Sequence, residues 1–139
     1  MSPVLLRADD AEQSAIHTIE AFGPVSTLIP YDSIDHLVEL VARGEGSLTA
    51  SVVSGDPEFV RRSVQGISPY HGRVLVLDER SAAESTGHGT PMPQLVHGGP
   101  GRAGGGQEEA GLRAVHGHMQ LTALQGHPQV LDDVVSPHV

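Results

Sequence analysis

Apolar residues in the first two thirds of the chain occur in short runs separated by polar or glycine-containing turns. Four of these runs lie at residues 4–6, 25–29, 47–53 and 73–77, and they are rich in Val, Leu and Ile. β-Branched and other aliphatic side chains pack well on a pleated surface, and Gly, Pro, Ser and Asp bound the runs. The pattern therefore predicts four β-strands.

Between these runs the apolar spacing changes to that of a helix. From residue 34 to 41 the apolar positions follow i, i+3, i+4, i+7, which predicts an amphipathic helix capped by Asp32 or Ser33 and ended by Gly44. After the third run, an Asp-Pro-Glu sequence supplies an N-cap, a first-turn proline and an acid near the positive helix end. This predicts a second helix over residues 57–67.

Strands that alternate with helices are typical of α/β proteins, in which right-handed crossovers join parallel strands. We therefore expect a short, mostly parallel sheet flanked by helices. Residues 81–106 are rich in glycine and predict a long loop, which is followed by a helix over 107–116 and a final strand at 121–124. We expect one domain over residues 1–126 and a flexible acidic tail over 127–139.

Composition limits both the core and the partners. The chain has 139 residues, 3% aromatic residues and no Trp, so its core has to be built from Val, Leu, Ile and Ala. It carries 8 basic residues, all of them Arg, against 17 acidic residues, a net charge of −9. A chain without a basic surface is a poor ligand for phosphates, and we expect no nucleic-acid partner.

The apolar runs are also too short for a membrane span, which needs about 18 apolar residues, and no segment resembles a signal peptide. We expect no membrane partner and a cytoplasmic location. The absence of cysteine excludes disulfides and thiolate metal sites.

Two local patterns contain residue types that are typical of binding sites. The sequence Gly-Pro-Gly-Arg-Ala-Gly at residues 99–104 has the spacing of a dinucleotide-binding loop, but a proline occupies its turn and no βαβ unit surrounds it. His116 and His118 lie near His88 and His97 in the sequence, but residues at i and i+2 diverge on a helix, so we expect no metal site. An autonomous nucleotide site at residues 98–106 stays open as a weaker hypothesis.

Three motifs occur in an order that resembles the aldehyde dehydrogenase family. They are Glu-Ala-Phe-Gly-Pro-Val at residues 20–25, Gly-Ser-Leu-Thr-Ala-Ser-Val-Val at 46–53 and Gly-Arg-Val-Leu-Val-Leu at 72–77. Residues 85–106 and 112–126 are similar to the dehydrogenase half of the bifunctional phenylacetate-degradation proteins. The resemblance extends over residues 3–126 and implies the C-terminal part of the aldehyde dehydrogenase fold.

The resemblance also implies a chemistry, in which a cysteine attacks the aldehyde, hydride passes to NAD or NADP, and a glutamate activates water for hydrolysis. By position, Glu20 would bind the ribose next to the nicotinamide and Phe22 would pack against that ring. His97, Gly98 and Gly99 would lie at the substrate pocket. Without the resemblance, the preferred interpretation of Glu20 is an exposed acid at a strand end and that of Phe22 is a core side chain; with it, the cofactor role is favoured.

Further implications concern partners. The last strand corresponds to the family's subunit-pairing segment, which implies a homo-oligomer. The substrate would be an aldehyde or, as in the bifunctional relatives, a semialdehyde linked to coenzyme A.

The family's cysteine, its catalytic glutamate and its cofactor-binding Rossmann half have no counterpart here. We therefore expect a C-terminal fragment that is inactive until the missing half or another subunit completes it. The alternative is a non-catalytic assembly module or a truncated remnant.

Overall fold

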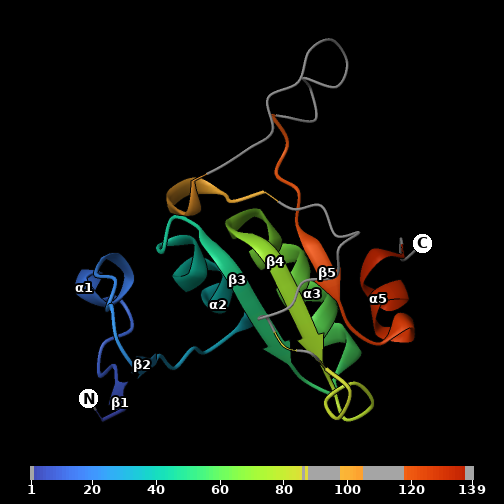
Figure 1. Ribbon diagram of the computed structural model, residues 1–139, viewed down its shortest axis with the longest axis horizontal. Coiled ribbons are helices and arrows are strands. Elements are labelled where there is room, and N and C mark those ends of the chain that lie inside the picture. Colours follow the sequence, from blue (N-terminus) through green and yellow to red (C-terminus); the bar gives the residue numbers. More distant parts are fainter. Residues whose placement is uncertain (1, 86, 88–97, 105–117, 137–139) are drawn as a thin grey trace.

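The computed structural model describes residues 2–85, 87, 98–104 and 118–136 (Figure 1). Its strands are β1 (Val4–Arg7), β2 (Val25–Leu28), β3 (Ser47–Val53), β4 (His71–Leu77) and β5 (Ala123–Gln125). Its helices are α1 (Ser14–Thr18), α2 (Ile34–Ala42), α3 (Pro57–Ile67) and α5 (Pro128–Val135), with 3-10 turns η1 (Ser68–Tyr70) and η2 (Gly101–Ala103).

The described strands form two parallel sheets. β1 pairs with β2, and β3, β4 and β5 pair in that order. The expected α/β class with parallel strands and flanking helices is therefore confirmed. The described strands form two separate sheets, however, whereas the sequence predicted a single sheet.

The three-stranded sheet carries the core. α3 lies next to α2 on one side and α5 on the other, and it packs against β3 and β4 (Figure 1). β4 is the central strand and is buried along six of its seven residues. The core cluster is entirely aliphatic, as the composition predicts, and consists of Val52, Val60, Val64, Ile67, Val74, Val76, Val130 and Val134.

Local capping explains where the two predicted helices begin. The Ser33 hydroxyl accepts a hydrogen bond from the His36 amide at the start of α2. The Asp56 carboxylate accepts from the amides of Glu58 and Phe59 at 3.0 and 3.2 Å. These acceptors satisfy amides that a helix leaves without partners, so both predictions of helix starts are confirmed.

The end of α2 agrees with the expected stop at Gly44 in its position, but not in its backbone conformation. Gly44 lies two residues beyond the helix, but the left-handed backbone follows it, at Glu45 with φ 58° and Gly46 with φ 111°. Position 46 requires glycine for a second reason as well, because a Cβ there would lie 2.2 Å from the Pro100 oxygen.

The C-terminal segment also differs from the expectation of a flexible tail. Residues 128–135 form α5, which begins with Pro128 at its first turn and contacts α3. Val130 and Val134 are buried, and the Gln65 side chain donates to the Val134 oxygen at 3.1 Å. Burial of these valines offsets the cost of ordering the acidic segment.

β4 begins about two residues before its predicted start, and β5 begins about two residues after its predicted start. β4 begins at His71 because that residue pairs with Ser47, and β5 begins at Ala123, where it pairs with Arg73. The helix predicted at 107–116 lies outside the described residues. The subunit-pairing role of the last strand stays a prediction, since here β5 pairs with β4 of the same chain.

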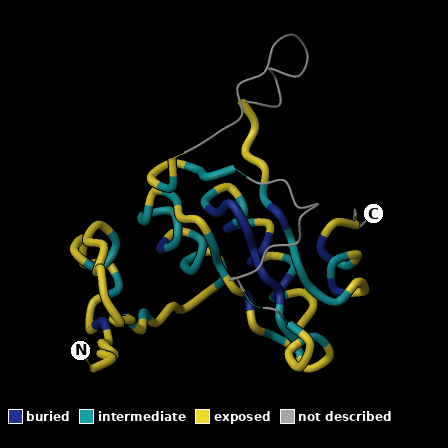
Figure 2. The backbone as a smooth tube through the Cα atoms, in the orientation of Figure 1, coloured by how far each residue is buried: buried dark blue, intermediate teal, exposed yellow. Residues whose placement is uncertain are grey.

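The N-terminal unit, comprising β1, α1 and β2, is much less buried than the rest (Figure 2). All four residues of β1 are exposed, and α1 contains no buried residue. A two-stranded sheet has little stability alone, so this unit depends on contacts elsewhere. No described helix has the length and apolar character of a membrane span.

Candidate functional site

The two residues expected at the cofactor follow directly after α1. Glu20 and Phe22 lie between α1 and β2, and both are exposed. The Phe22 side chain is 94% exposed, which excludes the alternative that it fills the core of this chain. Because both side chains are exposed, and the Glu20 carboxylate has no hydrogen-bond partner among the described residues, both are accessible to a ligand or to another chain.

α1 itself is short and weakly packed. It lacks a side-chain N-cap; the Thr18 hydroxyl donates to the Ser14 oxygen within the helix, and His17 Nε2 contacts the oxygen of Ala11, which precedes the helix. The amide of Ile19 closes the helix on the Ala15 oxygen at 3.1 Å. A five-residue helix gains little from backbone hydrogen bonds, so its position is set by tertiary contacts.

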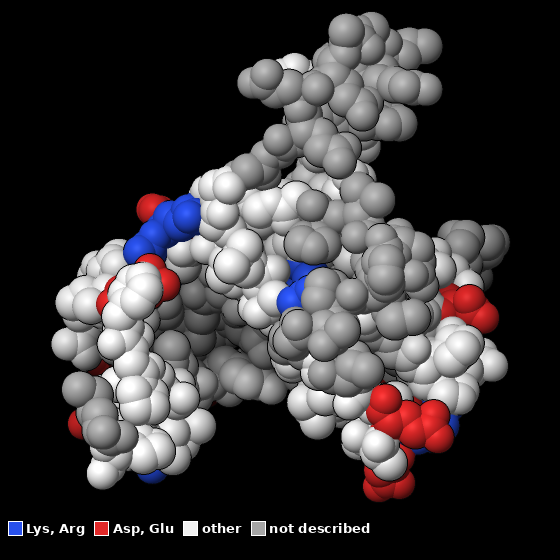
Figure 3. All heavy atoms as spheres, viewed as in Figure 1, with Lys and Arg blue, Asp and Glu red and all other residues white. Residues whose placement is uncertain are grey.

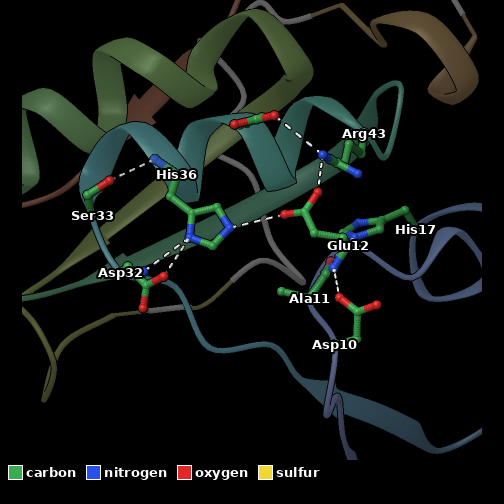
Figure 4. Close-up of polar contacts among 9 residues, drawn as sticks. Asp10, Ala11, Glu12, His17, Asp32, Ser33, His36 and Arg43 are labelled. Carbon is green, nitrogen blue, oxygen red and sulfur yellow. Dashed lines mark hydrogen bonds and ion pairs between the residues drawn. The ribbon is translucent and has the colours of Figure 1, made fainter.

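The first of these contacts precedes α1 (Figure 4). The Glu12 carboxylate pairs with the Arg43 guanidinium and accepts from His36 Nε2 at 3.3 Å. His36 Nδ1 accepts from the Asp32 amide at 3.2 Å, so the proton of the neutral ring is assigned to Nε2. Glu12 therefore attaches the N-terminal unit to α2.

The glycine loop, residues 98–104, packs closely on the starts of β3 and β4. The Gly98 amide donates to the Leu121 oxygen at 3.1 Å, and a Cβ on Gly72 would lie 2.2 Å from the Gly98 oxygen. Gly101 has φ 49°, and a Cβ there would lie 1.8 Å from the Glu45 oxygen. Backbone therefore lies against backbone at two places, which fixes the loop.

Arg102 joins this loop to α1. Its Nη1 donates to the His17 oxygen at 3.3 Å and its Nη2 donates to the Thr18 oxygen at 3.1 Å. Its own amide donates to the Glu45 oxygen at 2.9 Å. The C-terminal end of α1, two residues before Glu20, is thereby tied to the loop that contains Gly98 and Gly99.

A mainly apolar cavity of about 390 Å³ separates α1 from α2 and β3. Ile16 and His17 line it from α1, and Leu37 and Val41 line it from α2. Because the cavity lies between them, α1 is held mainly by polar contacts at its two ends.

Other expected sites are only partly visible. His97, with the substrate-pocket role expected beside Gly98 and Gly99, lies outside the described residues, as do His88 and His116. Within the described ranges, no group of three or more His, Asp or Glu side chains could hold a metal ion. On the face in Figure 3, the arginine side chains form separate patches, and the one at the upper left has acidic side chains beside it.

Comparison with known proteins identifies the class to which this fold belongs. Residues 1–123 match the model of the aldehyde dehydrogenase family. That match covers most of the chain, and the chain therefore belongs to this family. The resemblance carried by the three ordered motifs is confirmed.

The chain is also similar to individual curated proteins. The chain is 52% identical over 130 residues to "Protein MaoC" of Klebsiella aerogenes, covering 93% of this chain and 39% of that protein. It is 46% identical over 101 residues to a 3,4-dehydroadipyl-CoA semialdehyde dehydrogenase of Aromatoleum evansii, covering 72% of this chain and 20% of that enzyme. A hydroxyisobutyraldehyde dehydrogenase of Mycolicibacterium austroafricanum is 29% identical over 113 residues.

The chain thus spans from about a fifth to about two fifths of the length of the first two relatives. The sequence predicted Glu20, Phe22 and the paired glycines as site residues, but it did not predict the contacts of Glu12 and Arg102 that hold the segments next to them. Arg102 lies 84 residues from Thr18, and Glu12 lies 24 residues from His36. No local pattern predicts such pairs; the only signal was a single arginine within a glycine-rich loop.

Proposed function

We propose that this chain is the C-terminal part of an NAD(P)-dependent aldehyde dehydrogenase and works only when completed by a cysteine-bearing part. The observation that supports this most is the pair of exposed side chains, Glu20 and Phe22, within the family's motif. The chain has no cysteine, so it cannot form the covalent intermediate on which that oxidation depends.

The side chains of Glu20 and Phe22 have chemical groups that suit the binding of a nucleotide. An ionised carboxylate makes stronger hydrogen bonds to ribose hydroxyls than a neutral acceptor does, and Glu20 has no competing partner among the described residues. Phe22 offers an exposed ring that can pack on a flat heterocycle. When bound, NAD(P)+ accepts the hydride released by the aldehyde carbon.

Within the proposed enzyme, Glu20 orients the ribose and Phe22 presents one face of the ring. Gly98 and Gly99 border the substrate side of the site, together with His97. The catalytic cysteine and most of the nucleotide-binding surface come from the completing part.

We further propose a semialdehyde linked to coenzyme A as the substrate, with the acid as product. The printed name of the Aromatoleum evansii relative supports this, as does its 46% identity. A cytoplasmic location, homo-oligomerisation through the last strand and a place in phenylacetate catabolism belong to the same proposal.

The test uses this chain co-expressed with the cysteine-bearing N-terminal part of a related dehydrogenase. In that complemented enzyme, Glu20→Ala should raise the KM for NAD(P)+ by about tenfold, because a charged hydrogen bond is worth about 1.5–3 kcal/mol. Glu79→Ala, which removes another exposed acid, is the matched control. An unchanged KM for Glu20→Ala would contradict the cofactor role.

A second candidate is a non-catalytic assembly module. The exposed apolar residues of the N-terminal unit favour it, since they suit a surface covered by another chain: Val4, Leu5, Leu6, Phe22, Val25 and Leu28. This alternative predicts stable association with a dehydrogenase part but no turnover in the complex.

A further inference from the structure

The contacts of Arg102 carry an inference that goes beyond the proposed function and rests on it. We propose that Arg102 is a positioning residue, which holds the C-terminal end of α1 so that Glu20 and Phe22 face the cofactor. Arg102 does not itself contact the cofactor in this proposal. It acts through the backbone that leads to Glu20.

The first step is the position of the guanidinium. Arg102 follows Gly101, which has a left-handed backbone. A Cβ at that position would lie only 1.8 Å from the Glu45 oxygen, so only glycine fits there. The Arg102 amide bonds the same Glu45 oxygen at 2.9 Å. The base of the side chain is therefore fixed on the end of α2 and the start of β3.

The second step is what the guanidinium binds. The last carbonyls of a helix have no partner within the helix, and they form its negative end. Arg102 donates to two of them, at His17 and Thr18. A planar guanidinium with several donors can bind two neighbouring oxygens at once, whereas a lysine ammonium is a single point charge.

The third step is that α1 has little other support on this side among the described residues, where only Ile16 and His17 are half-buried. The helix has no buried residue, and a cavity separates it from α2. Glu12 holds the chain before α1, and within the described residues Arg102 supplies the side-chain contact that crosses to its C-terminal end. Segment 19–24 leaves α1 at this end and joins β2 at its other end, where the Val4 amide bonds the Pro24 oxygen, so Arg102 holds the point from which the segment begins.

The local part of the inference is tested on the full chain alone, by hydrogen exchange of the Ile19 amide, which closes α1 on the Ala15 oxygen. Arg102→Ala should speed this exchange by roughly fivefold, and Arg102→Lys should restore part of the protection. Arg62→Ala is the matched control, because Arg62 pairs with Asp35 on the α2–α3 surface. Equal exchange in Arg102→Ala and in the unmodified chain would overturn the inference.

The functional part is tested in the complemented enzyme. Arg102→Ala should raise the KM for NAD(P)+ by roughly fivefold with less than a twofold change in kcat, and Arg102→Lys should lie between the two. A fall in kcat with unchanged KM would overturn the positioning role. If Glu20→Ala leaves the KM unchanged while Arg102→Ala still speeds exchange of the Ile19 amide, the proposed function is wrong but the local contact is confirmed. If Glu20→Ala raises the KM while Arg102→Ala changes neither the exchange nor the KM, only the role of Arg102 is wrong.

Discussion

At the scale of single residues, close backbone contacts decide which side chains the glycine loop tolerates. Gly101 and Gly55 differ sharply in this respect. A Cβ on Gly101 would lie 1.8 Å from the Glu45 oxygen at a left-handed φ of 49°, whereas a Cβ on Gly55 would meet nothing within 4 Å. The same substitution at the two positions therefore separates loop packing from a general effect of losing glycine.

We predict that Gly101→Ala destabilises the chain by about 1–3 kcal/mol, because strained backbone and a displaced loop both cost free energy. Gly55→Ala should change the free energy of unfolding by less than about 1 kcal/mol. Urea denaturation followed by circular dichroism measures both. Equal stability of the two variants would show that the loop does not lie against Glu45.

Asp78 gives a second prediction at this scale. Its carboxylate is 8% exposed, and this burial alone would raise its pKa. Hydrogen bonds from the Arg80 side chain at 2.7 Å and from Ser81 at 3.0 Å, with the charge of Arg80, outweigh burial and lower the pKa from 3.8 to about 2. Since the folded pKa is the lower one, this contact stabilises the chain above about pH 4 and is lost as the pH falls toward 2.

An NMR titration of the Asp78 carboxyl carbon should therefore show a midpoint near 2. Arg80→Ala should move that midpoint upward, because it removes both a hydrogen bond and a nearby positive charge. A midpoint at 3.8 in the unmodified chain would contradict the packed turn at residues 78–81.

At the scale of elements, α5 is the main departure from what the sequence suggested. Its neighbouring valines make a direct test, since Val134 is 3% exposed and Val135 is 67% exposed. We predict that Val134→Ala lowers the free energy of unfolding by about 2 kcal/mol, from lost burial and the cavity left behind. Val135→Ala should stay within about 0.5 kcal/mol. Similar small effects in both variants would mean that α5 does not pack on α3 in solution.

Elements with strong local signals could be predicted well. α3 has its N-cap, its proline and its buried stripe within 12 residues, and both its ends match the prediction. α5 also carries local signals, namely Pro128 at the first turn and the i, i+4 pair Val130 and Val134. The acidic residues of this segment nevertheless led to the prediction of a flexible tail, because burial against α3 cannot be deduced from the segment alone.

At the scale of the whole molecule, the candidate site could be predicted only in part. Glu20 and Phe22 were predicted from an ordered family resemblance, not from spacing or composition, and their role stays a prediction. Arg102 could not be found that way, because its partners lie 84 and 85 residues away and are backbone oxygens, which any residue provides. The division into two sheets likewise depends on contacts that no local pattern records.

The central claim is that the chain is one part of a dehydrogenase and needs another part for catalysis. The most direct measurement is NAD(P)+-dependent aldehyde oxidation, assayed with the purified chain alone, the cysteine-bearing N-terminal part alone, and both co-expressed. We predict activity only in the co-expressed sample, since the chain contributes the Glu20 motif and the other part contributes the nucleophile. Turnover by the chain alone, or no turnover by a stable co-expressed complex, would contradict this account.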